Sequence, residues 1–124
     1  MKINKISHPE LKDHINMTYL YSENKNQEMI DKTDNLIKNY LASNIFIIST
    51  ENSKAVKIPY GNHGEYVIPI FTDQKEYERG QEYFRLNDMD ENKDYKIGKL
   101  KRIDDPKFLG YLINIASASY ITLF

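Results

Sequence analysis

Four oxygen-bearing side chains alternate along one acidic run, at a spacing that calcium-binding loops use. They are Asp88, Asp90, Asn92 and Asp94. An EF-hand takes ligands from positions 1, 3, 5 and 7, but it also needs glycine at position 6 and a bidentate glutamate at position 12. Lys93 and Lys99 occupy those two positions here. Because a lysine supplies no ligand oxygen and repels a cation, the run predicts a solvated acidic loop and no metal site.

No other group of residues has the spacing of a catalytic or cofactor site. The three histidines, His8, His14 and His63, contain no i, i+4 pair of the kind that zinc proteases use. The absence of cysteine excludes disulfides, thiolate zinc sites and cysteine nucleophiles. Neither a Gly-x-Ser-x-Gly elbow nor a glycine-rich phosphate loop is present. We therefore expect no catalytic residues, no cofactor and no enzymatic activity.

The overall charge argues against polyanionic partners. In 124 residues, 17 Lys and Arg stand against 18 Asp and Glu, a net charge of -1. One basic cluster exists, made of Lys96, Lys99, Lys101 and Arg102. Nearby acids are expected to offset it, namely Asp94, Asp104 and Asp105. We therefore expect neither a nucleic-acid partner nor an anionic membrane surface, since both need a basic footprint.

The distribution of apolar residues predicts one cytoplasmic domain. No run approaches the roughly 18 consecutive apolar residues of a membrane span. The basic start of the chain is not followed by the apolar stretch of a secretory signal. A length near that of one typical domain favours a single core.

Tyrosines suggest a contact surface. The chain has 10 tyrosines and no tryptophan, and tyrosine is enriched at protein interfaces because it combines large contact area with a polar tip. Tyr60 and Tyr66 flank a loop with two glycines that also holds His63. Tyr60, His63 and Tyr66 are thus a candidate interaction surface, with core or half-buried tyrosines as the alternative.

The first half of the chain predicts a helix followed by three strands. An amphipathic helix is expected over 26–42. Its apolar residues recur every three or four positions, at Met29, Ile30, Thr33, Leu36, Ile37, Tyr40 and Leu41. Strands are expected at 44–49, 54–59 and 65–71. Pro69 cannot donate to a ladder, so we expect it at an edge-facing or bulged position.

The second half predicts two more helices and two more strands. Thr72 is expected to cap a helix that runs from Asp73 to about Phe84. A strand is expected at 95–103. The sequence Asp104-Asp105-Pro106 is typical of a helix start, and an apolar stripe follows it at Phe108, Leu109, Leu112, Ile113 and Ala116. The last predicted strand is 120–124.

These elements predict the α+β class, with a single mixed sheet of about five strands packed by three helices. Residues 1–25 are expected to be an irregular N-terminal segment, in which 7–10 could open a short helix. Residues 26–124 are expected to form the domain. If 120–124 lies at a sheet edge, it offers a route to a homodimer.

Part of this pattern resembles the N-terminal domain of the SseB family, named for enhanced serine sensitivity. The matching features are the strand Ile45-Phe46-Ile47-Ile48, a hairpin, and the phrase VIPIFTDQKEY that starts at Val67. The segment 108–124 is similar to the closing helix and strand of that family, and the resemblance covers roughly residues 30–124. Two family features, an Asn-Pro pair after the last strand and a second domain in many members, are not in this sequence.

The resemblance implies an α+β module of a bacterial cytoplasmic protein, without known catalytic residues and with accessory or secretion-linked roles. In the motif, Pro69 is expected to stiffen a strand end, Phe71 to pack in the core and Thr72 to cap the next helix. The favoured function is a non-enzymatic protein-interaction module whose protein partner is unknown. The alternatives are an immunity or chaperone-like protein for a secreted toxin, a small ligand-binding domain, and a calcium switch at 88–94.

Overall fold

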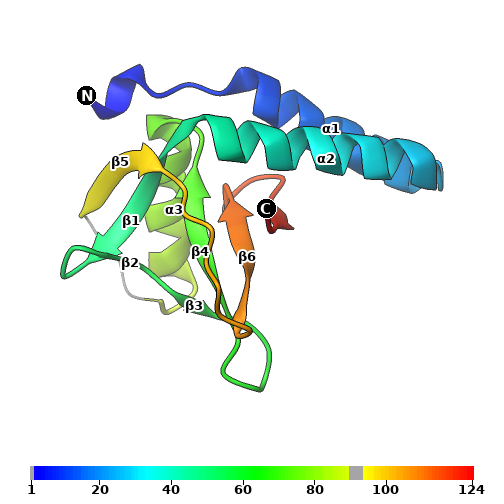
Figure 1. Cartoon of the computed structure of the whole chain (residues 1–124). Helices are drawn as coiled ribbons and strands as arrows, with labels where there is room; N and C mark the ends of the chain where they lie inside the picture. The colour runs from blue at the N-terminus through cyan, green and yellow to red at the C-terminus, as the bar shows by residue number, and fades with distance from the viewer. Residues whose placement is uncertain (1, 90–93) are drawn as a thin grey trace.

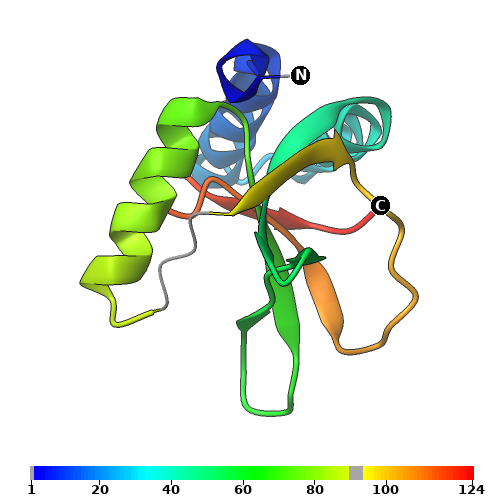
Figure 2. The same ribbon diagram turned by 90° about the vertical axis from the view of Figure 1, so that its left-hand side faces the viewer.

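The computed structural model describes residues 2–89 and 94–124, and it places one mixed sheet between two layers of helices (Figure 1, Figure 2). The helices are a short 3-10 turn (Ile3–Lys5), α1 (Pro9–Glu23), α2 (Gln27–Ser43) and α3 (Gln74–Leu86). The strands are β1 (Ile45–Glu51), β2 (Lys54–Ala55), β3 (Ile58–Pro59), β4 (Tyr66–Phe71), β5 (Tyr95–Lys99), β6 (Phe108–Ile113) and β7 (Tyr120–Thr122). The predicted α+β class is confirmed, although the sheet has seven strands rather than five. Within the two described ranges, no helix has the length and apolar character that crossing a bilayer requires.

The sheet combines antiparallel and parallel pairs. β1 pairs antiparallel with β4 and with β5, and β4 pairs parallel with β6. β7 pairs antiparallel with β6. β2 pairs with the end of β1, and β3 with the start of β4. In the described chain β5 and β7 each pair with a single strand, so both present an outer edge.

Alternating side chains of the central strands form two cores, one on each face of the sheet. One core joins β1, β4 and β6 to α1 and α2, and it includes Leu11, Ile15, Ile37, Leu41, Phe46, Ile48, Ile70 and Ile113. The other joins the same strands to α3, and it includes Ile47, Val67, Phe71, Tyr77, Phe84 and Leu112. We call the two sides the hairpin face and the α3 face, because α1 and α2 form an antiparallel helical hairpin (Figure 1).

The N-terminal segment is not irregular, and the prediction for residues 1–25 was wrong. α1 begins with Pro9, where the missing N–H has no helical partner to lose. It buries Leu11, Ile15 and Thr18, spaced at i, i+4 and i+7 on one face. The hairpin that α1 forms with α2 extends beyond the edge of the sheet (Figure 1).

The prediction of a helix after Pro106 was also wrong, because this segment forms strand β6. Five of its six residues are buried, since β6 lies between β4 and β7 with a core on either face. Val67 pairs with Gly110 while Tyr66 pairs with Phe108, so that the register shifts by one residue between them. A continuous apolar run fits a strand covered on both faces as well as it fits a buried helix. Two of the three predicted helices are present as α2 and α3, and the third helix of the structure is α1 instead of the segment after Pro106.

Several predicted strands are shorter than expected, including the last one, in which β7 ends at Thr122 rather than at residue 124. Residues 54–59 form β2 and β3 separately, and β5 ends at Lys99 rather than at residue 103. The ladder between β1 and β4 ends at the pair Ile48–Ile70. The next residue of β1 is Ser49, and the next position of the antiparallel β4 is Pro69. The Ser49 carbonyl accepts from Val56 N at 2.9 Å rather than from β4. Pro69 thus lies where β4 has no ladder partner in β1, so its missing N–H leaves no bond unmade.

α3 begins one residue later than predicted and approaches the sheet closely. Its N-cap is Asp73, not Thr72, and the Asp73 carboxylate accepts from Glu76 N at 2.9 Å. A Cβ placed on Gly80 would lie 2.4 Å from Cε1 of Phe71. Glycine at this position therefore permits the contact between the helix and the buried Phe71 ring.

Candidate functional site

The three residues of the family-like motif are buried structural positions. Phe71 has 0% exposure, and its ring meets that of Tyr77 edge-on at a centroid distance of 5.4 Å. Thr72 is equally buried, its N–H donates to Asn114 Oδ1 at 3.1 Å, and its hydroxyl accepts from Asn114 Nδ2 at 3.0 Å. Pro69 is also fully buried. These residues join β4 to the end of β6 and to α3, and they offer no surface to a ligand.

A charged cluster lies at the carboxyl ends of the parallel strands β4 and β6, a position where α/β sheets often bind ligands. Glu76 is at its centre, with a side chain only 3% exposed. Its Oε2 accepts from Ser117 Oγ at 2.6 Å, and its Oε1 lies 3.3 Å from Lys12 Nζ. Lys12 Nζ also lies 3.1 Å from Asp73 Oδ2. The cluster therefore connects α1, α3 and the turn that leads to β7.

This cluster is electrostatically satisfied. Burial would raise the pKa of Asp73, but the hydrogen bond from Glu76 N and the nearby Lys12 ammonium outweigh it and lower that pKa. Burial would lower the pKa of Lys12, but Asp73 and Glu76 outweigh it and raise that pKa. A pocket of about 170 Å³ adjoins the cluster. In the described chain every buried side-chain N or O has a partner, so the arrangement is that of a clamp between elements.

The predicted tyrosine surface is only partly exposed. Tyr60 is 51% exposed, and His63 is exposed in the loop between β3 and β4. Tyr66 is only 9% exposed, and its hydroxyl donates to Asp105 Oδ2 at 2.8 Å. Lys57 Nζ covers the Tyr66 ring at 4.7 Å from its centroid. Tyr66 is therefore a core residue, a correction to its place in the predicted surface.

His8 is the one buried histidine, and it holds α2 against the start of the sheet. Its Nε2 lies 2.6 Å from Ile45 O and its Nδ1 lies 2.7 Å from Tyr40 OH. Because a carbonyl only accepts, the neutral ring carries its proton on Nε2 and accepts from Tyr40. Burial lowers the pKa of His8, and it outweighs the Ile45 hydrogen bond and the Asp73 charge, which raise it.

The structure describes only part of the acidic run that was weighed as a calcium loop, because residues 90–93 lie outside the described residues. Among the residues at 2–89 and 94–124, no three His, Asp or Glu side chains are placed to hold a metal ion together. His14 lies 3.6 Å from Glu10 along α1, and His63 is in the exposed loop.

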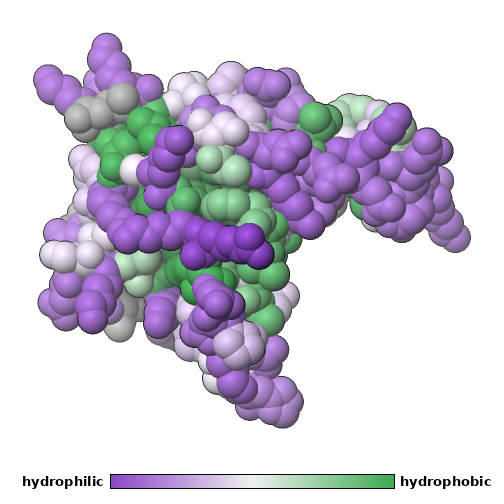
Figure 3. Space-filling model, in the orientation of Figure 1, coloured by the Kyte–Doolittle hydropathy of each residue, from purple (hydrophilic) through white to green (hydrophobic). Residues whose placement is uncertain are grey.

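An open concavity lies on the hairpin face, in the angle beneath α2. Two adjoining pockets of about 460 and 90 Å³ share Ile103. Their apolar floor consists of Ile48, Ile68, Ile103, Tyr111, Leu123 and Phe124. Their cationic rim consists of Lys38, Lys96, Lys99, Lys101 and Arg102. We call this surface the basic groove, and Figure 3 shows apolar surface in this angle, bordered and crossed by hydrophilic side chains.

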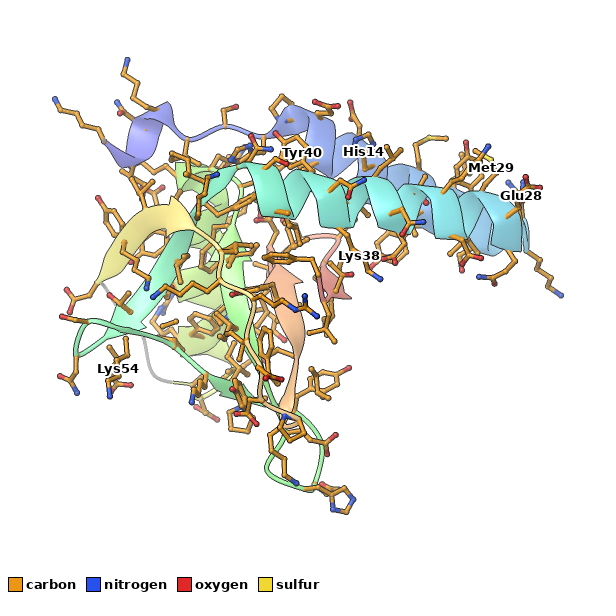
Figure 4. All side chains as sticks on the ribbon, viewed as in Figure 1. His14, Glu28, Met29, Lys38, Tyr40 and Lys54 are labelled. Atoms are coloured by element: carbon orange, nitrogen blue, oxygen red, sulfur yellow. The ribbon has the colours of Figure 1, made fainter. Side chains whose placement is uncertain are left out.

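The cations of the rim are largely unpaired. Lys38 points from α2 toward the C-terminal segment (Figure 4), and its Nζ lies 3.0 Å from Asp34 Oδ2. The other four are exposed and form no ion pair within the described chain. Asp105, which was expected to offset them, instead accepts from Tyr66 OH and from Lys107 N. Among the described residues, Asp104 is the one acid that lines the groove, so these residues give the rim an excess of positive charge.

The sequence revealed the cations of this groove but not the groove itself. Four of the five rim cations lie within 96–102, where their clustering was visible. The floor comes from β1, β4, the segment after β5, β6 and the chain end, five segments that no local pattern connects. Only the topology of the sheet brings them together.

A second group of exposed apolar side chains lies on the α1–α2 hairpin, at Met17, Tyr19, Leu20 and Leu36. Acidic and basic residues alternate around it, including Glu23, Lys25, Glu28, Asp31 and Lys32. This group lies on convex helices, and no pocket described in the structure is lined by it.

Comparison with known proteins gives no relative from which a function could be transferred. No family model, no curated protein and no solved structure matches the chain. The similarity to the SseB N-terminal domain therefore stays a prediction.

Proposed function

We propose that this protein is a non-enzymatic interaction module that binds another protein at the basic groove. The observation that supports this most strongly is an apolar floor, exposed at Leu123 and half-buried at Ile103 and Phe124. Beside it lie four exposed cations that form no ion pair within the described chain. Interfaces usually combine an apolar centre with a polar rim. Apolar area left open in this way is a cost to a monomer that a partner would remove.

The alternative positions for a function are less favourable. In the Glu76 cluster, Lys12 pairs with both carboxylates and Arg79 lies 3.5 Å from Glu76, so two cations face two carboxylates. Its buried polar atoms also have partners. The pKa values of Asp73 and Lys12 are both shifted toward the charged forms that pair with each other, as in a structural ion pair. The cluster instead connects α1, α3 and the turn before β7.

Site-specific photo-crosslinking in the native cells tests this proposal. A photoreactive residue at Leu123, which is 46% exposed in the groove, should give a discrete crosslinked protein. The same residue at Lys75, exposed on α3, is the matched control and should give none. Equal crosslinking at both positions, or a product from Lys75 alone, would contradict the groove as the binding surface.

A further inference from the structure

We propose that the partner presents to the basic groove an acidic, amphipathic segment, with carboxylates for the rim and apolar side chains for the floor. This inference rests on the proposed function and adds the chemistry of the partner. It follows from charge complementarity and from the composition of the two parts of the groove.

The rim requires negative charge on the partner. Lys96, Lys99, Lys101 and Arg102 face solvent, and no ion pair within the described chain neutralises them. Several like charges at one edge add their potentials, which attracts an opposite charge and discriminates against a like one. Lys38 contributes less to the positive potential of the rim, because its ammonium group already pairs with the Asp34 carboxylate.

The floor requires apolar side chains, which argues against a polyanion alone. Leu123 is 46% exposed, and Ile103 is half-buried. Single-stranded nucleic acid binds through aromatic platforms on which bases stack. The two aromatic rings of the groove instead stack on each other, Tyr111 and Phe124, at a centroid distance of 5.8 Å. Tyr111 is also only 4% exposed.

A second copy of this chain does not fit the groove. A two-fold symmetric contact uses the same patch on both subunits. Such a contact would bring two rims with the same excess of positive charge into one interface. A different chain with acidic residues avoids this repulsion.

A peptide selection tests the chemistry directly. The probe is a phage-displayed library of random peptides about 12 residues long, a length that spans a groove of this kind. It is selected in parallel on the full wild-type chain and on two double variants. Lys101→Glu/Arg102→Glu reverses two rim charges outside any helix or strand. Lys32→Glu/Lys75→Glu makes the same change in net charge at exposed positions that do not line the groove.

We expect wild-type and control protein to enrich peptides rich in Asp and Glu together with Leu, Ile, Val or Phe. A synthetic peptide of the selected sequence should bind the rim variant at least about 10-fold more weakly, because two attractive pairs become repulsive. Its affinity for wild-type protein should also fall as salt rises from about 0.05 to about 0.3 M. Should the rim variant fail to fold, Lys101→Gln/Arg102→Gln should give a smaller loss in the same direction.

The outcomes separate the two proposals. Peptides that compete at the groove but lack acidic residues would overturn the partner chemistry and leave the proposed function intact. If Leu123→Ser does not weaken any selected peptide, both proposals fail, since the groove is then not the binding surface. Equal binding of oligo-dT or anionic lipid vesicles, lost in the rim variant, would overturn the acidic protein segment in favour of a simple polyanion. Self-association that the rim variant abolishes would overturn it in favour of a second copy.

Discussion

Replacing Gly80 by alanine tests the closeness of α3 to the sheet, because two known effects oppose each other there. Alanine favours a helix interior over glycine by about 1 kcal/mol, so an exposed site would be stabilised. At Gly80 the added Cβ would lie 2.4 Å from Phe71 Cε1 and 2.8 Å from Phe71 Cζ. Carbon atoms in ordinary contact are about 3.5–4.0 Å apart, so the ring or the helix has to move by roughly 1 Å.

The clash should outweigh the helix propensity. Phe71 is fully buried, and Tyr77 packs edge-on against it, so its ring has no free space to enter. Overpacking of a well-filled core costs about 1–3 kcal/mol. We therefore expect Gly80→Ala to lower the free energy of unfolding by up to about 2 kcal/mol.

The measurement is urea unfolding followed by circular dichroism, with stability compared at equal m-value. Gly98→Ala in β5 is the matched control, because a Cβ there meets nothing within 4 Å. That variant should be unchanged or more stable by about 0.5 kcal/mol. Phe71→Leu makes the side chain smaller and should lower the free energy of unfolding less in the Gly80→Ala variant than in the wild type. The two residues are in contact, so the effects of the two substitutions are not additive. An increase of about 1 kcal/mol for Gly80→Ala would refute the close packing of α3.

Three further changes test other parts of the fold. Because the pKa of His8 is lowered in the native state, the unfolded chain binds the proton more tightly; stability should fall as pH drops below about 6.5. This loss should be smaller in His8→Gln when urea unfolding is measured from pH 7 to pH 5, and an unchanged slope would contradict the buried neutral ring. Asn114→Ala removes the partner of the buried Thr72 N–H, so we expect a loss of about 1–3 kcal/mol by the same assay; a loss below 0.5 kcal/mol or so would argue against this connection. Gly110 has a φ of 140°, and a Cβ there would lie 2.8 Å from the Thr122 carbonyl oxygen; Gly110→Ala should therefore lower the melting temperature, and an unchanged value would mean that β7 is not held at this distance.

The parts of the fold that the sequence predicted are those with an unambiguous local period. α2 repeats its apolar residues every three to four positions, and β1 is a short β-branched run that ends in a turn. α1 was missed because its apolar residues do not keep to one face. Leu11 and Ile15 are buried, whereas Met17, Tyr19 and Leu20 are exposed. A polar helix with a weak apolar stripe becomes stable by packing against a neighbouring element, and the sequence of the helix alone does not show that neighbour.

β6 was mistaken for a helix for the opposite reason. Asp104-Asp105-Pro106 has the residues of a helix start, but Asp105 accepts from Lys107 N and Tyr66 OH and holds a turn before β6. The apolar run that follows is buried on both faces, which removes the alternation that identifies a strand. The groove could not be predicted either, because its floor depends on this parallel pairing of β4 and β6.

The most direct test of the account is hydrogen exchange of the full chain with and without the protein captured by crosslinking at Leu123. We predict added protection at 96–104 and at 120–124, the segments that supply the rim and part of the floor. Exchange in the 60–64 loop and at the start of α3 should be unchanged. Protection confined to the 60–64 loop or to α3, with none at 96–104, would contradict the groove as the functional surface.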